Sequence, residues 1–166
     1  MSIFPTKILL AIDGSEEAEL AALKAVELAD GTDSELHVAH VGVVPTFLRS
    51  DFGTRGYDGK LYEEIEEESR ELLRKLSWRV KVAGGTVAGE HLRMGAVDLE
   101  ITGLAKELGV DLIVMGCRGH GGIRRAIEGS ISEAVIRRAP CPVLVVRSHL
   151  GFEATDRSAL LQGGGP

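Results

Sequence analysis

Residues 112–122 read Leu-Ile-Val-Met-Gly-Cys-Arg-Gly-His-Gly-Gly, an apolar run that passes directly into a glycine-rich segment. A continuous apolar run is typical of a strand that is buried on both faces inside a parallel sheet. Further on, Gly129-Ser130 precedes an expected helix, and Glu133 stands three residues after Ser130, as in a capping box. Bare backbone N–H groups and a helix N-terminus in one place attract anions, and phosphate above all. We therefore interpret this stretch as a buried strand followed by a phosphate-binding loop.

The rest of the chain alternates between apolar strands and amphipathic helices. The expected strands cover residues 7–12, 36–41, 86–94, 111–115 and 143–146. The first helix is expected to begin after the cap residue Ser15 and to end at Gly31. The longest expected helix covers residues 60–82, and Gly109 is expected to end the helix after it. This alternation predicts an α/β fold, a Rossmann-like, doubly wound five-stranded parallel sheet in the order 3-2-1-4-5 with helices on both faces.

The predicted topology also selects a place for a ligand. In a doubly wound sheet, ligands bind beyond the carboxyl ends of the strands where the winding direction reverses. Here the reversal falls between the strand that ends at Asp13-Gly14-Ser15 and the strand that ends at Gly116. The glycine-rich segment and the switch point thus predict the same crevice.

Composition limits the protein class and the partners. The 166 residues carry a formal net charge of −6, which gives no support to nucleic acid or an anionic membrane as a partner, because both attract basic surfaces. No apolar run approaches the roughly 20 residues of a membrane span, and two cysteines, Cys117 and Cys141, are too few for a disulfide scaffold. We expect a soluble, cytoplasmic protein with one domain over residues 1–147 and a weakly ordered tail over residues 148–166.

Two common phosphate motifs are absent. A Walker A loop needs G-x-x-x-x-G-K-[S/T], but Gly59-Lys60 is followed by Leu61 and no buried strand precedes it. The dinucleotide fingerprint G-x-G-x-x-G is also unmet, because Arg124 stands three residues after Gly121. A nicotinamide or flavin dinucleotide is therefore not expected.

A longer ordered pattern is present. Gly116-Cys-Arg-Gly119, nine residues, and then Gly129-Ser130 resemble the G-x2-G-x9-G-[S/T] pattern of the nucleotide-binding branch of the universal stress protein family. Residues 7–15, 36–41 and 139–146 also look like that family, so that the resemblance spans residues 5–147. The ordered set is more specific than any one of its parts.

The resemblance implies a bound adenine nucleotide, either ATP or AMP/ADP, with Mg²⁺ or Mn²⁺ bridging the phosphates and no metal-ligand set in the protein. It implies that the phosphates are held by Gly116, Gly119, Gly129 and Ser130, with Arg118 and His120 nearby and with further donors from Ile131 and Ser132. It implies that the adenosine lies against Ala11 and Asp13, and that the backbone of Val41 meets the adenine edge. Met115 is also expected to bind the nucleotide. It also implies a homodimer that pairs through Val143–Val146.

Several alternatives remain open from the sequence. The first hypothesis is an ATP-binding stress-response or signalling module, the second a slow ATPase that uses the same pocket, and the third a structural dimerisation module without nucleotide. His120 and Asp13 are the candidate bases for hydrolysis, but nothing in their spacing selects them. No catalytic residue is therefore assigned.

Individual residues also have simpler interpretations. Gly116 and Gly119 alone could form a turn, and Asp13 could serve only to cap the following helix. Cys117 has a redox interpretation beside the more common one of a small buried thiol. His37 and His40 are interpreted as structural residues rather than as metal ligands, because no Cys/His spacing accompanies them.

Overall fold

The computed structural model describes residues 5–44, 58–117 and 130–148. The elements in chain order are β1 (Lys7–Ala11), α1 (Glu16–Thr32), β2 (Glu35–Gly42), α2 (Asp58–Val82), β3 (Val87–Met94), α3 (Val97–Leu108), β4 (Leu112–Gly116), α4 (Ser130–Arg138) and β5 (Val143–Val146). The expected tail over residues 148–166 lies outside the described residues from position 149 onward.

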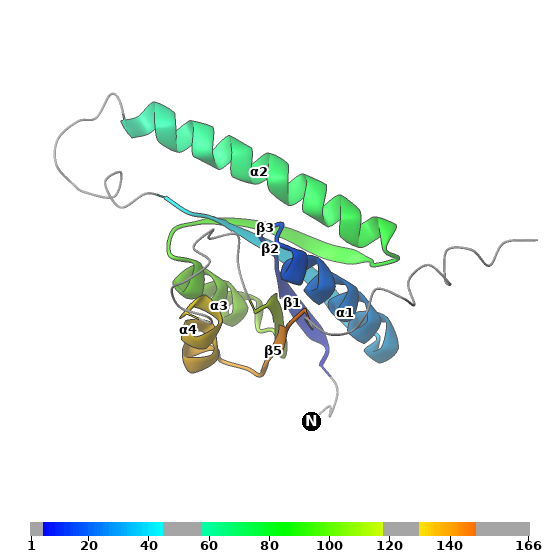
Figure 1. Ribbon diagram of the computed structural model, residues 1–166. Coiled ribbons are helices and arrows are strands. Elements are labelled where there is room, and N and C mark those ends of the chain that lie inside the picture. Colours follow the sequence, from blue (N-terminus) through cyan, green and yellow to red (C-terminus); the bar gives the residue numbers. More distant parts are fainter. Residues whose placement is uncertain (1–4, 45–57, 118–129, 149–166) are drawn as a thin grey trace, which may run out of the picture.

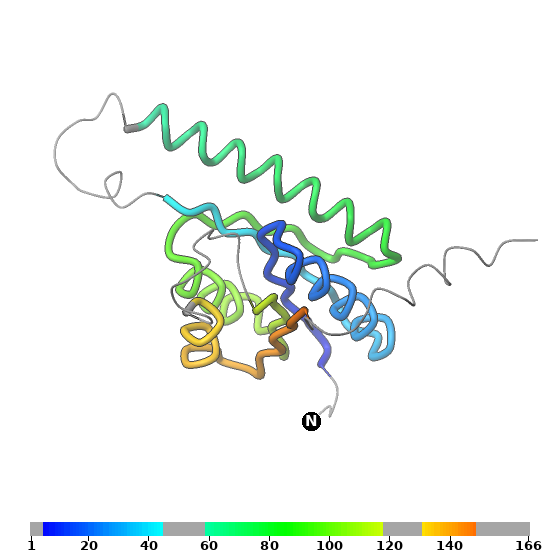
Figure 2. Tube along the Cα trace, in the orientation of Figure 1, coloured from blue at the N-terminus to red at the C-terminus, as the bar shows by residue number. Residues whose placement is uncertain are grey.

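The strands form one five-stranded sheet in the order β3-β2-β1-β4-β5, and every neighbouring pair is parallel. This is the predicted order. Helices α1 and α2 cover one face and α3 and α4 cover the other (Figure 1). The chain trace in Figure 2 shows α2 running along β2 and β3, which it contacts.

The central strands carry the apolar side chains of two cores, one on each face of the sheet. Ile8 and Leu10 of β1 point to the core under α1 and α2, whereas Leu9 and Ala11 point to the core under α3 and α4. All four are buried, and only Ala11 keeps any exposed surface. A strand buried on both faces must be apolar throughout, which explains why β1 and β4 lack the polar–apolar alternation of a surface strand.

Helix α1 begins as predicted. The Ser15 hydroxyl accepts the backbone N–H of Ala18 at 3.2 Å, and acidic residues fill the first turn, where the helix dipole favours them. Ala18, Ala21 and Ala25 are buried against the sheet. Small side chains at helical spacing bring the helix axis close to the strands.

The predicted end of α1 at Gly31 is wrong. The helix continues to Thr32, and Asp33 takes the left-handed conformation with φ of 53° and donates its N–H to the Ala29 carbonyl. Asp tolerates this conformation better than most residues because its short polar side chain bonds locally. The prediction for Gly109 is confirmed, since it follows α3 with φ of 61°.

Candidate functional site

The carboxyl ends of β1, β2 and β4 lie side by side at the switch point. Ala11 is in register with Ala39 of β2 on one side and with Met115 of β4 on the other. Beyond β1, the Ile12 N–H donates to the Ala39 carbonyl at 2.9 Å, and Gly14 takes a φ of 83°. The chain therefore turns sharply into α1 at the place that the topology predicted.

A cavity of about 510 Å³ opens at these strand ends. Its volume falls within the range of pockets that hold small molecules and cofactors. The predicted site residues that line it are Ala11, Asp13, Val41, Met115, Gly116, Ile131 and Ser132. These residues come from both sides of the switch point and from the first turn of α4, so the structure brings together segments that are far apart in the sequence.

Four other predicted site residues, Arg118, Gly119, His120 and Gly129, lie outside the described residues. Ser130 is described as the residue at which α4 begins. Ser132 is buried at the cavity wall, whereas Ile131 is exposed. The described half of the predicted phosphate region is therefore a strand end and a helix N-terminus beside one cavity.

Asp13 supports the turn into α1 and also lines the cavity. Its carboxylate accepts the backbone N–H of Ser15 at 2.9 Å, which supports the turn into α1. It also lines the cavity. The turn holds the Asp13 side chain at the cavity wall, so its helix-starting role does not remove it from the candidate site.

Gly116 is constrained by packing as well as by any ligand. A Cβ at this position would lie 2.8 Å from the backbone nitrogen of Ala18 and 2.8 Å from the carbonyl carbon of Glu17. Both atoms belong to the backbone of α1, which cannot move aside cheaply. Glycine at this position therefore allows β4 to end against the first turn of α1.

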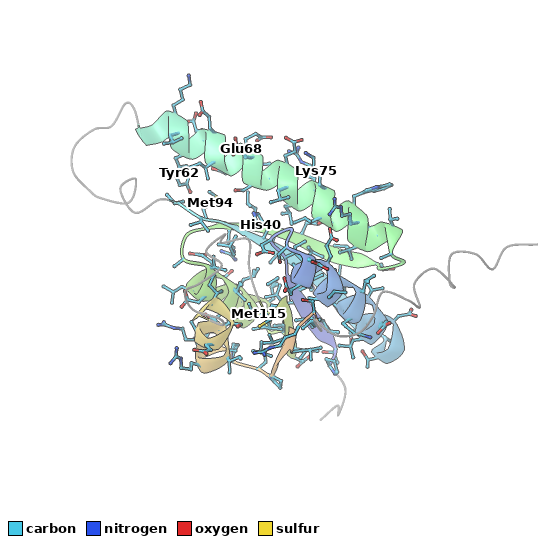
Figure 3. All side chains as sticks on the ribbon, viewed as in Figure 1. His40, Tyr62, Glu68, Lys75, Met94 and Met115 are labelled. Carbon is cyan, nitrogen blue, oxygen red and sulfur yellow. The ribbon has the colours of Figure 1, made fainter. Side chains whose placement is uncertain are left out.

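Residues from the end of β2 and from α2 complete the cavity and were not among the predicted site residues. Those with polar side chains are His40, Glu68 and Ser69. His40 and Glu68 are labelled in Figure 3. Ile65 and Leu72 add apolar surface. The sequence signal for the apolar pair is helical spacing, since Ile65 and Leu72 stand seven residues apart on one face of α2. No sequence signal predicted that Ser69 and His40 line the same cavity, because they do so only when α2 packs on β2.

The two histidines of β2 have separate structural partners. His40 Nδ1 lies 2.8 Å from the Ile12 carbonyl oxygen. His37 Nδ1 lies 3.0 Å from His91 Nε2 of β3, and burial, followed by the charge of the neighbouring His37, lowers the pKa of His91. Within the described ranges, no group of three or more His, Cys, Asp or Glu side chains could hold a metal ion. These contacts agree with the structural interpretation of both residues.

Comparison with known proteins identifies the family. The model of the universal stress protein family matches residues 5–147. The chain belongs to the universal stress protein family. A Staphylococcus haemolyticus protein assigned to the universal stress proteins is 41% identical over 143 residues, which cover 86% of this chain and 84% of that protein.

Solved universal stress proteins share the fold. The protein UspA from Lactobacillus plantarum matches with a TM-score of 0.71 at 26% identity, over 88% of this chain and 100% of that one. A universal stress protein crystallised in complex with cAMP matches with a TM-score of 0.57 at 24% identity, over 86% of this chain and 97% of that one. In the described part of this universal stress protein, no helix has the length and hydropathy needed to cross a membrane.

Proposed function

We propose that this universal stress protein holds an adenine nucleotide, ATP or AMP/ADP, in the crevice between β1 and β4, and acts as a stress-response or signalling module. The observation that carries the proposal is the cavity of about 510 Å³, whose lining includes Ala11, Asp13, Val41, Met115, Gly116, Ile131 and Ser132. Predicted site residues from separate segments of the chain line one cavity, and this supports the proposal more strongly than the glycine pattern does by itself.

The chemistry of the lining suits an amphipathic ligand with one anionic end. The first turn of α4 contributes Ile131 and Ser132 to the cavity, so the positive end of a helix dipole lies beside it. Ala11, Val41 and Met115 supply buried apolar surface that suits a purine. We assign the phosphates to the α4 side and the nucleoside to the apolar side.

The divalent cation is proposed to reach this site with the phosphates. The described residues contain no ligand set that could hold a metal without them, and Mg²⁺ is commonly bound through substrate phosphates and few protein ligands. The cation would neutralise phosphate charge in a protein whose own net charge is −6.

The cAMP complex of the related universal stress protein concerns that protein alone. It is an instance of this fold holding an adenine nucleotide, and so it agrees with the proposal. Among the described residues that line the cavity, Asp13 is the carboxylate beside β1. This carboxylate accepts the backbone N–H of Ser15 in the turn, and that role is structural rather than catalytic. Nucleotide binding is therefore the function we favour.

The first experiment is to denature the purified protein by heat and to chromatograph the released small molecules. An adenine nucleotide in the supernatant supports the proposal. If none is released and added ATP with Mg²⁺ does not bind either, the nucleotide function is wrong and the structural dimerisation module remains. Incubation with labelled ATP then separates a holder from a slow ATPase by the phosphate that accumulates.

The mutation that tests the phosphate-loop assignment is Gly119→Val, which places a branched side chain in the predicted loop. We expect it to abolish ATP binding, measured by calorimetry, and to leave the fold intact, because close approach to phosphate needs a bare backbone. Gly31→Val is the control, since a Cβ at Gly31 meets nothing within 4 Å and the residue lies far along α1 from the cavity. Full ATP affinity in Gly119→Val would show that the loop assignment is wrong.

A further inference from the structure

We propose that His40 and Ser69 form a polar wall that recognises a hydrogen-bond donor on the nucleoside half of the ligand. The inference rests on the proposed nucleotide function and adds a specificity determinant to it. Both side chains line the cavity, one from the end of β2 and the other from α2 (His40 is labelled in Figure 3).

The contact of His40 with Ile12 determines which ring nitrogen can accept. His40 Nδ1 lies 2.8 Å from the Ile12 carbonyl oxygen, and a carbonyl can only accept a hydrogen bond, so Nδ1 carries a proton. In the neutral ring, Nε2 is then an acceptor. His40 is only 7% exposed, and its ring has no second hydrogen bond within the described residues. Nε2 is therefore an acceptor without a hydrogen bond in the described residues, on a side chain that lines the cavity.

Ser69 supplies a second polar atom to the same wall. The residue is 8% exposed and lines the cavity from α2. A Cβ at Gly42 would lie 2.5 Å from Ser69 Oγ and 2.5 Å from Met94 Sδ, so glycine at position 42 lets α2 approach the end of β2. The hydroxyl borders the cavity, where a ligand or water can satisfy it.

A third polar residue lines the cavity beside His40 and Ser69. It is Glu68, from the same turn of α2 as Ser69. The His40 Nε2 acceptor favours a ligand group that donates a hydrogen bond over a carbonyl oxygen, whereas the Ser69 hydroxyl can donate or accept. The exocyclic amine of adenine and the ribose hydroxyls are the donors of a nucleotide, whereas guanine presents a carbonyl in place of that amine.

The position of the wall agrees with contact to the nucleoside. Strand β2 is separated from β4 by β1, and adjacent strands lie about 4.8 Å apart, so the strand that carries His40 lies roughly 10 Å across the sheet from β4. This separation lets one nucleotide span from the N-terminus of α4 to the wall. We therefore assign the donor to the ribose or the base rather than to a phosphate.

The test uses two isosteres of His40. In His40→Asn, the side-chain amide replaces Nδ1 and can still donate to the Ile12 carbonyl, but the acceptor at Nε2 is lost. In His40→Gln, the amide reaches the position of Nε2 and can accept there. We expect His40→Asn to weaken ATP binding about tenfold, the cost of one lost hydrogen bond, and His40→Gln to weaken it less.

Nucleotide analogues identify the group that is recognised. Affinities are measured by calorimetry for ATP, 2′-deoxyATP, 3′-deoxyATP and purine riboside triphosphate, which lacks the exocyclic amine. The His40→Asn effect should disappear with the one analogue that lacks the recognised donor, because that analogue has already lost the same hydrogen bond. Loss with a deoxy analogue identifies a ribose hydroxyl, and loss with purine riboside triphosphate identifies the amine.

The failures of the two proposals are distinguishable. If the wild-type protein binds no ATP, the nucleotide function itself is wrong. If the wild type binds ATP but His40→Asn lowers the affinity for all four nucleotides by one common factor, or by none, the polar wall is wrong and the nucleotide function stands. Should His40→Asn fail to fold in thermal unfolding, Ser69→Ala is carried through the same four titrations with the same criterion.

Discussion

Ser77 carries a buried hydroxyl that has no hydrogen-bond partner in the described part of the chain. It is 1% exposed and lies in α2, on the side that also buries Leu73, Leu76 and Val80 against the sheet. A polar group removed from water without a partner keeps its full desolvation cost. At the scale of one residue, this is the clearest unfavourable contribution to stability.

We predict that Ser77→Ala stabilises the protein by about 1 kcal/mol, because it removes the unpaired hydroxyl and because alanine favours the helix. Thermal unfolding should show a rise of about 2–4 °C for a chain of this size. Ser69→Ala is the matched control on the same helix, and we expect a smaller gain because its hydroxyl borders the cavity, where water can reach it. An unchanged or lower melting temperature for Ser77→Ala would contradict this account.

At the scale of elements, the contact between β4 and the first turn of α1 holds the switch point together. Gly116 brings the strand end against backbone atoms of Glu17 and Ala18. The same region is supported from β5, since the Cys117 N–H donates to the Val146 carbonyl at 2.8 Å and the Ser148 hydroxyl donates to the Glu17 carboxylate at 3.0 Å. One side of the candidate site is therefore supported by β4, by the first turn of α1 and by the end of β5.

We predict that Gly116→Ala destabilises the fold by about 1–3 kcal/mol, the usual cost of overpacking, whatever its effect on nucleotide. Denaturant unfolding without ligand measures this cost. Gly103→Ala provides the control, because Gly103 lies inside α3 and a Cβ added there would meet nothing within 4 Å, so that alanine should stabilise by about 0.5–1 kcal/mol. Equal stability of Gly116→Ala and the wild type would mean that the backbone of α1 yields easily.

At the scale of the whole molecule, the two edges of the sheet differ. The β3 edge carries charged residues in ion pairs, Glu90 with Lys81 and Arg93 with Glu107. The β5 edge is a short apolar strand, Val143–Val146, in which Leu144 is 37% exposed. Charged edges resist pairing, whereas apolar edges invite it. We therefore propose that two copies of the chain pair through β5.

We predict that Leu144→Asp converts a dimer into a monomer, because it places a charge on the apolar edge strand. Light scattering coupled to size-exclusion chromatography measures the mass in solution. Ala88→Asp, on the exposed surface of the opposite edge strand β3, should leave the mass unchanged. A wild-type protein that is monomeric at all concentrations, or a Leu144→Asp variant that remains dimeric, would contradict pairing through β5.

The order of the elements was predictable because each carries its own local signal. The apolar runs of β1 and β4 indicated strands buried on both faces, and Ser15 and Gly109 marked helix ends through backbone chemistry that acts within a few residues. The end of α1 was mispredicted because Asp33 can adopt the conformation that glycine usually supplies.

By itself, the sequence determined the α/β alternation, the sheet order and the crevice at the switch point in which a ligand is expected. Apolar runs and helical spacing are local patterns, and the alternation of strands with helices limits the topologies that the chain can adopt. Only the tertiary structure decided which surface of α2 meets the end of β2, and so joined Ser69, Gly42 and His40 in one cavity wall. The reason is physical: these contacts depend on how a long helix is oriented on the sheet, and that orientation is set by the packing of both cores together rather than by any one segment.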